Sequence, residues 1–83
     1  MHAPVEAQVR AFLAEQFPSP DGAVVAGDAS LFETGILDSM GVLTLVTWLE
    51  ETFGFTVEDD EVLPENIDGI DRLVAYIGRK QGG

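Results

Sequence analysis

The segment from Ser39 to Phe53 limits the possible fold more than any other part of the chain. Its apolar residues recur every three or four positions, which places one group of them on a single side of a helix: Val42, Leu45, Val46, Leu49 and Phe53. Asp38 precedes the helix as a possible cap, and Gly54 follows it where a left-handed C-cap is common. We therefore predict an amphipathic helix that packs one face into a core.

Two more helices are predicted on either side of this one. The first begins near Pro4, ends before Pro18 and Pro20, and carries a single apolar face: Val5, Val9, Phe12, Leu13 and Phe17. The last has Asp68 as a possible cap, cations at its end in Arg79 and Lys80, and its own apolar positions: Ile70, Leu73, Val74 and Ile77.

The connections differ in length and composition. About twenty residues rich in Gly, Pro and Asp join the first two helices, a long loop that its apolar residues are expected to pin to the core: Val24, Val25, Leu31, Phe32, Ile36 and Leu37. A short acidic stretch has room for one helical turn, which Pro64 is expected to close. The prediction is a single all-α domain over 1–83, a small four-helix bundle of three main helices and one short helix. Residues 1–3 and 80–83 are expected to be flexible.

The charge of the chain is strongly one-sided. Fifteen acids and four basic residues give a net charge of −11, and no Lys or Arg lies between Ala11 and Asp71. Such a surface repels nucleic acids and anionic membranes, whose binding depends on Lys and Arg contacts to phosphate. It favours basic patches on protein partners, and it also favours a monomer because two copies would repel each other. Acidic residues can equally serve only to keep a small domain in solution.

Other classes are excluded by what the sequence lacks. It has no cysteine, so disulfides and thiolate metal sites are absent. It shows no apolar run long enough to span a membrane and no secretion signal, so a cytoplasmic location is expected. The acids of EDDEVLPENIDG do not follow the spacing of an EF-hand loop, which argues against calcium binding.

The second helix has an unusual outer face. Met40, Leu43, Glu50 and Glu51 lie away from the core stripe on a helical wheel, which indicates either packing beneath the long loop or a small docking surface with an acidic rim. Trp48, at the edge of the core stripe, is interpreted as a packing residue.

Ser39 stands at the start of that helix and has three possible roles. A nucleophilic serine needs a base, but the one histidine is His2 and the one lysine is Lys80, at opposite ends of the chain. A capping serine is common, yet Asp38 can cap the helix instead. A hydroxyl left free there would suit a phosphodiester, because helix N-termini stabilise phosphate.

The segment LFETGILDSMGVLTLVTWLEETFGF, followed by an acidic stretch, Pro64 and a last helix, resembles acyl carrier proteins over most of the chain. The D-S-M tripeptide after GIL is similar to the family's prosthetic-group site. The resemblance implies a non-catalytic carrier on which a phosphopantetheinyl transferase, using magnesium, attaches 4′-phosphopantetheine from coenzyme A to Ser39. The thiol of that arm would hold an acyl group as a thioester.

The resemblance also implies partners. Loading and condensing enzymes with basic patches would dock on the second helix, through Asp38, Met40, Leu43, Glu50, Glu51 and Val57. Gly41 and Thr44 stand where many fatty-acid carriers have acids, and LDSMG is also similar to D-alanyl carrier proteins. Fatty-acid-like, polyketide or related specialised biosynthesis, and aminoacyl or D-alanyl transfer, therefore stay open, as does a plain acidic interaction domain in which Ser39 is only a cap.

Overall fold

The computed structural model describes residues 4–17 and 26–82 of the chain. Its helices are α1 (Val5–Gln16), α2 (Ser39–Phe53), α3 (Pro64–Ile67) and α4 (Ile70–Gly82), with a 3-10 turn, η1 (Asp59–Glu61), between α2 and α3. No strand occurs in these described ranges. The predicted all-α fold of three main helices and one short helix is confirmed.

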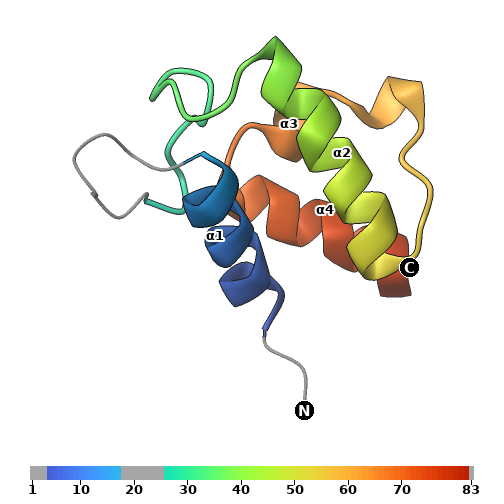
Figure 1. The fold of residues 1–83 in the computed structure, drawn as a ribbon. Coiled ribbons are helices and arrows are strands. Elements are labelled where there is room, and N and C mark those ends of the chain that lie inside the picture. Colours follow the sequence, from blue (N-terminus) through green and yellow to red (C-terminus); the bar gives the residue numbers. More distant parts are fainter. Residues whose placement is uncertain (1–3, 18–25, 83) are drawn as a thin grey trace.

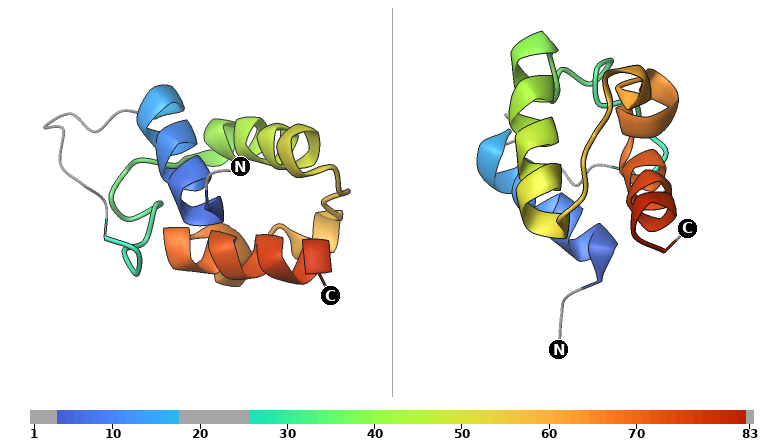
Figure 2. Two further views of the ribbon diagram at one scale, coloured as in Figure 1. Left: turned by 90° about the horizontal axis from the view of Figure 1, so that it is seen from below. Right: turned by 90° about the vertical axis from the view of Figure 1, so that its right-hand side faces the viewer.

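The three long helices enclose the core. α2 and α4 lie on opposite sides of it, α1 crosses between them at one end, and the segment linking α2 to α3 closes the other end (Figure 1, Figure 2). The core contains part of the apolar face expected for each long helix, among them Val9, Leu13, Leu45, Leu49 and Leu73. Other expected residues are only partly buried and pack against this core: Val5, Phe17, Val42, Val46, Phe53 and Val74.

Aromatic side chains join these helices in a continuous series. The Phe12 ring of α1 stacks on Trp48 of α2, with ring centroids 4.3 Å apart. Trp48 contacts Phe53, which contacts Phe55, and Phe55 meets Tyr76 of α4 edge to face. Trp48 is thus a packing residue, as predicted, and the series connects α1, α2 and α4 along the edge of the core.

Helix boundaries follow the local chemistry, with three corrections. Gly54 ends α2 in the left-handed conformation, φ 73°, as predicted. Pro64 begins α3 rather than closing the acidic turn, because its missing N–H and fixed φ suit the first position of a helix. The last helix does not end at Lys80 but continues to Gly82.

The third correction concerns Asp68. This residue was predicted to cap the last helix, but its carboxylate instead binds the long loop. The Ser30 hydroxyl donates to its Oδ2 at 2.7 Å, and the Phe32 N–H donates to its Oδ1 at 2.9 Å. Leu31 and Leu37 are buried beneath this contact, as expected, whereas Phe32 is 38% exposed. Val24 and Val25, also expected to pin the loop, lie outside the described residues.

The environment of Asp68 favours its charged form. Partial burial would raise the pKa of this carboxyl, but the hydrogen bonds from Phe32 and Ser30 outweigh burial and lower the pKa below its ordinary value of 3.8. A lowered pKa in the folded state stabilises the fold above the ordinary pKa, and this contribution is lost as the pH falls through the lowered value.

Asp68→Asn is expected to lower the free energy of unfolding by about 1–3 kcal/mol at neutral pH, because a neutral amide accepts hydrogen bonds more weakly than a carboxylate. The difference from the wild type should shrink on acidification below 3.8, as Asp68 itself becomes protonated. Urea unfolding followed by circular dichroism measures both. Asp28→Asn, an exposed change in the same loop, is the control. Equal stability of Asp68→Asn and the wild type at neutral pH would contradict this role.

Candidate functional site at the start of helix α2

The first turn of α2 is capped by Asp38. This residue has an extended backbone, φ −131° and ψ −176°, and its carboxylate accepts the Gly41 N–H at 2.8 Å. The Asp38 carbonyl accepts the N–H of Val42, so the regular helical hydrogen bonds begin immediately. The cap predicted at Asp38 is confirmed.

Ser39 is the first residue of α2, and its side chain is exposed. Among the residues that the structure describes, its hydroxyl has no hydrogen-bond partner, since Asp38 has taken the capping position. The site therefore presents a free primary alcohol at the N-terminus of a fifteen-residue helix.

This position suits a phosphodiester. The first N–H groups of a helix lack intrahelical acceptors, and the aligned peptide dipoles add partial positive charge there. Both effects stabilise a phosphate attached to the helix start. By contrast, the surroundings do not suit a nucleophilic serine, because the amine of Lys80, the one lysine, is bound to Glu61 at 2.8 Å near the end of α4.

The outer face of α2 carries the two apolar side chains that the helical wheel placed away from the core. Met40 is 75% and Leu43 is 66% exposed, and Thr44, Thr47 and Glu51 are exposed as well. Met40 and Leu43 therefore do not pack beneath the long loop. An exposed apolar patch of Met40 and Leu43 lies next to Ser39, and the exposed Glu51 lies on the same helix about three turns further along.

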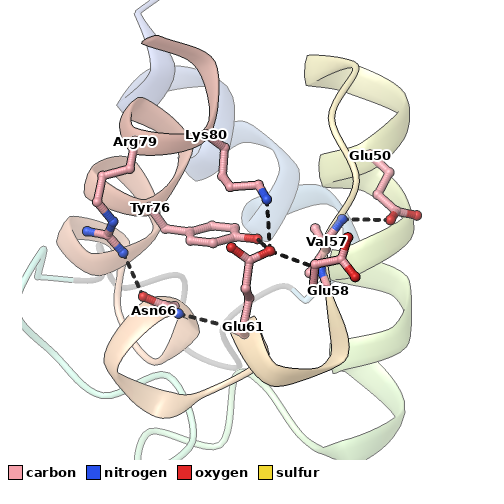
Figure 3. Close-up of polar contacts among 8 residues, drawn as sticks. All are labelled: Glu50, Val57, Glu58, Glu61, Asn66, Tyr76, Arg79 and Lys80. Carbon is pink, nitrogen blue, oxygen red and sulfur yellow. Dashed lines mark hydrogen bonds and ion pairs between the residues drawn. The ribbon is translucent and has the colours of Figure 1, made fainter. Parts of the chain in front are cut away.

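Glu50 and Val57 are placed differently from the rest of this predicted face. The Glu50 carboxylate accepts the Val57 N–H at 2.8 Å and so ties the segment after α2 back to the helix (Figure 3). Val57 is only 8% exposed and belongs to the core. Its side chain has little surface to offer a partner, which corrects its placement on the docking face. The physical reason is that the chain turns inward after Gly54 and carries Val57 with it.

The four basic residues are all engaged within the fold. Lys80 donates to Glu61 and Arg79 to the Asn66 side chain, and the Arg72 guanidinium donates to the Pro64 carbonyl (Figure 3 shows the first two). Arg10 pairs with Glu6 one turn away on α1. None of these contacts reaches the outer face of α2, which keeps its negative charge.

The Glu61 carboxylate is the centre of the contacts at α4. It accepts hydrogen bonds from Lys80, the Glu58 N–H and the Tyr76 hydroxyl (Figure 3). The Lys80 hydrogen bond is the largest of the causes that lower the pKa of Glu61. Burial, followed by the charge of Glu61, raises the pKa of Tyr76 to about 12. The sequence analysis did not predict this cluster. The one feature of the sequence that could have indicated it is the pair of cations at the end of the last helix.

The described residues contain no group of three or more acidic or histidine side chains that could hold a metal ion. In the same ranges, no helix is both long and apolar enough to cross a membrane.

Comparisons with known proteins identify the class of this site. The family described as "Phosphopantetheine attachment site" matches residues 7–77. The chain is 30% identical to an acyl carrier protein of Desulforapulum autotrophicum over 76 residues, which are 92% of this chain and 96% of that protein. It is 38% identical to a D-alanyl carrier protein of Abiotrophia defectiva over 53 residues, 64% of this chain and 67% of that protein.

The chain belongs to the phosphopantetheine-binding carrier proteins. Its prosthetic group is covalently attached 4′-phosphopantetheine, and its function is that of a carrier. The Ser39 hydroxyl is exposed and is not used as the helix cap, so it fits the phosphodiester by which such a group is attached.

The division of roles between Asp38 and Ser39 predicts different effects of removing each side chain. Asp38→Ala should lower the free energy of unfolding by about 1 kcal/mol through loss of the cap. Ser39→Ala should change it by less than about 0.5 kcal/mol, because the hydroxyl contributes no contact to the fold. Urea unfolding of the unmodified protein measures both, and a larger loss for Ser39→Ala than for Asp38→Ala would show that the serine is the cap.

Proposed function

We propose that Ser39 is the attachment residue and that the protein carries acyl intermediates in fatty-acid-like, polyketide or related specialised biosynthesis. The observation that carries this proposal is the exposed Ser39 hydroxyl, which the Asp38 cap leaves free at the helix start. When bound, the arm supplies a terminal thiol that holds the cargo as a thioester, which is consistent with a chain that has no cysteine of its own.

The protein's own residues supply the anchor and the recognition surface. Ser39 provides the oxygen for the phosphodiester, and the start of α2 stabilises the phosphate charge. The proposal includes no catalytic residue, because the one histidine, His2, is 37 positions before Ser39 in the sequence and Lys80 is occupied by Glu61. The partners are a phosphopantetheinyl transferase and enzymes that load or condense the cargo, acting on a monomeric carrier in the cytoplasm.

An aminoacyl or D-alanyl carrier is the second candidate. The similarity to a D-alanyl carrier protein favours it, since the identity over the matched residues is 38%. The two candidates use the same anchor and differ only in the enzyme that loads the thiol.

The attachment residue is tested by incubating the protein with coenzyme A, magnesium and a promiscuous phosphopantetheinyl transferase, followed by intact-protein mass spectrometry. We expect the mass to increase by one phosphopantetheine in the wild type and not at all in Ser39→Ala. Thr44→Ala, an exposed hydroxyl lost from the same helix, is the matched control and should be modified like the wild type. No addition to the wild type would leave the acidic interaction domain as the better interpretation.

The cargo is tested on the modified protein with an acyl-acid ligase and a D-alanine ligase in parallel. Thioester formation is read from the mass of the arm after its release. Acyl loading supports the first candidate, and D-alanyl loading in its place supports the second.

The docking surface is proposed to consist of Asp38, Met40, Leu43 and Glu51, with Glu50 at its inner edge. Met40 and Leu43 provide the exposed apolar centre, and the acids complement basic partner surfaces. Glu50 has a structural contact as well, because its carboxylate holds the Val57 N–H.

Substitutions of the two neighbouring glutamates should distinguish a role in docking from a role in stability. Glu51→Gln should raise KM for the transferase about threefold with unchanged stability, since it removes only an exposed charge at the rim. Glu50→Gln should instead lower the free energy of unfolding by about 1 kcal/mol, because the bond to Val57 loses its charge. Transferase kinetics and urea unfolding of both variants provide the comparison. Equal losses of stability in the two variants would contradict the stabilising role of the hydrogen bond between Glu50 and Val57.

A further inference from the structure

Gly41 is buried in the first turn of α2, against the ring of Phe17. A Cβ atom placed on Gly41 would lie 2.9 Å from Cε1 and 3.1 Å from Cζ of that ring, and 3.1 Å from Cδ1 of Leu37. Carbon atoms in contact are normally about 3.5–4.0 Å apart, so the ring can occupy this place only because residue 41 has no side chain.

Phe17 reaches α2 from the end of α1. It is the C-cap residue of α1, held by its N–H to the Leu13 carbonyl at 2.8 Å, and its ring meets Phe12 edge to face. Phe12 in turn stacks on Trp48, seven residues or about two turns beyond Gly41. The two rings of α1 therefore contact α2 at two points along one side of the helix.

The Phe17 ring and the Ser39 side chain lie on opposite sides of the first turn of α2. Ser39 precedes Gly41 by two residues, which is about 200° around a helix, so the Ser39 side chain leaves the turn on the side opposite the Phe17 ring. The same glycine donates its N–H to the Asp38 cap at 2.8 Å. Gly41 thus makes two contacts. Its N–H binds the Asp38 carboxylate, and its side without a Cβ atom faces the Phe17 ring.

We propose that Phe17, seated on Gly41, is a positioning contact that sets the orientation of the first turn of α2 and hence the approach of Ser39 to the transferase. This inference rests on the proposed attachment at Ser39. Neither residue touches the reacting atoms. A methyl group at position 41 displaces the ring, and loss of the ring leaves the turn without its support.

The test compares the rate of phosphopantetheine transfer to Gly41→Ala, Phe17→Leu and the double variant. Each single change should lower kcat about tenfold with KM changed by less than about twofold, because the serine is misaligned while Met40 and Leu43 still dock. The double variant should return to within about threefold of the wild type, because the added methyl group fills the space that the trimmed ring leaves. A change that only destabilised the fold would lower the concentration of folded carrier, and so would raise the apparent KM and leave kcat unchanged.

Gly78→Ala is the matched control, since a Cβ at this exposed position of α4 meets nothing within 4 Å. It should be modified at the wild-type rate. Wild-type kcat in a folded Gly41→Ala, or additive losses in the double variant, would overturn the inference. If Gly41→Ala does not fold, wild-type kcat in Phe17→Leu overturns it equally well. Absence of modification in the wild type would instead reject the attachment at Ser39 itself.

Discussion

The hydrogen bond from the Gly41 N–H to the Asp38 carboxylate determines how this protein presents its serine. A helix start needs an acceptor for its first N–H groups, and a serine at that place would ordinarily supply it. Because Asp38 fills the position one residue earlier, Ser39 enters the helix with its hydroxyl free and exposed. The cap of α2 and the exposed hydroxyl that we propose as the attachment site are thus provided by two adjacent side chains.

The surrounding scaffold keeps that turn in place through contacts that are distant in sequence. Asp68 holds the loop that leads into α2 through Ser30 and Phe32, and Phe17 supports the turn from the end of α1. Glu50 fixes the chain that leaves α2. The entry to α2, its first turn and its exit are therefore each held by a contact to another part of the fold.

The sequence predicted those features that depend on neighbours along the chain. The three long helices, the Gly54 C-cap, the Asp38 cap and the outward position of Met40 and Leu43 all follow from spacing and local chemistry. Asp68, Glu50 and Val57 were placed less well, because their roles depend on partners that only the tertiary fold brings near. Asp68 contacts residues 36 and 38 positions away, a pairing that no local pattern contains. Pro64 was ambiguous for a different reason, as proline both ends one element and starts another.

The engagement of every basic side chain within the fold has a consequence for how the molecule meets other proteins. Three of the four cations lie on α4, paired with the η1–α3 segment, whereas α2 carries none. No basic side chain on α2 therefore opposes the approach of a positively charged protein to this helix. The net charge of −11 attracts such a protein before contact. The attraction fades at high ionic strength as the field is screened.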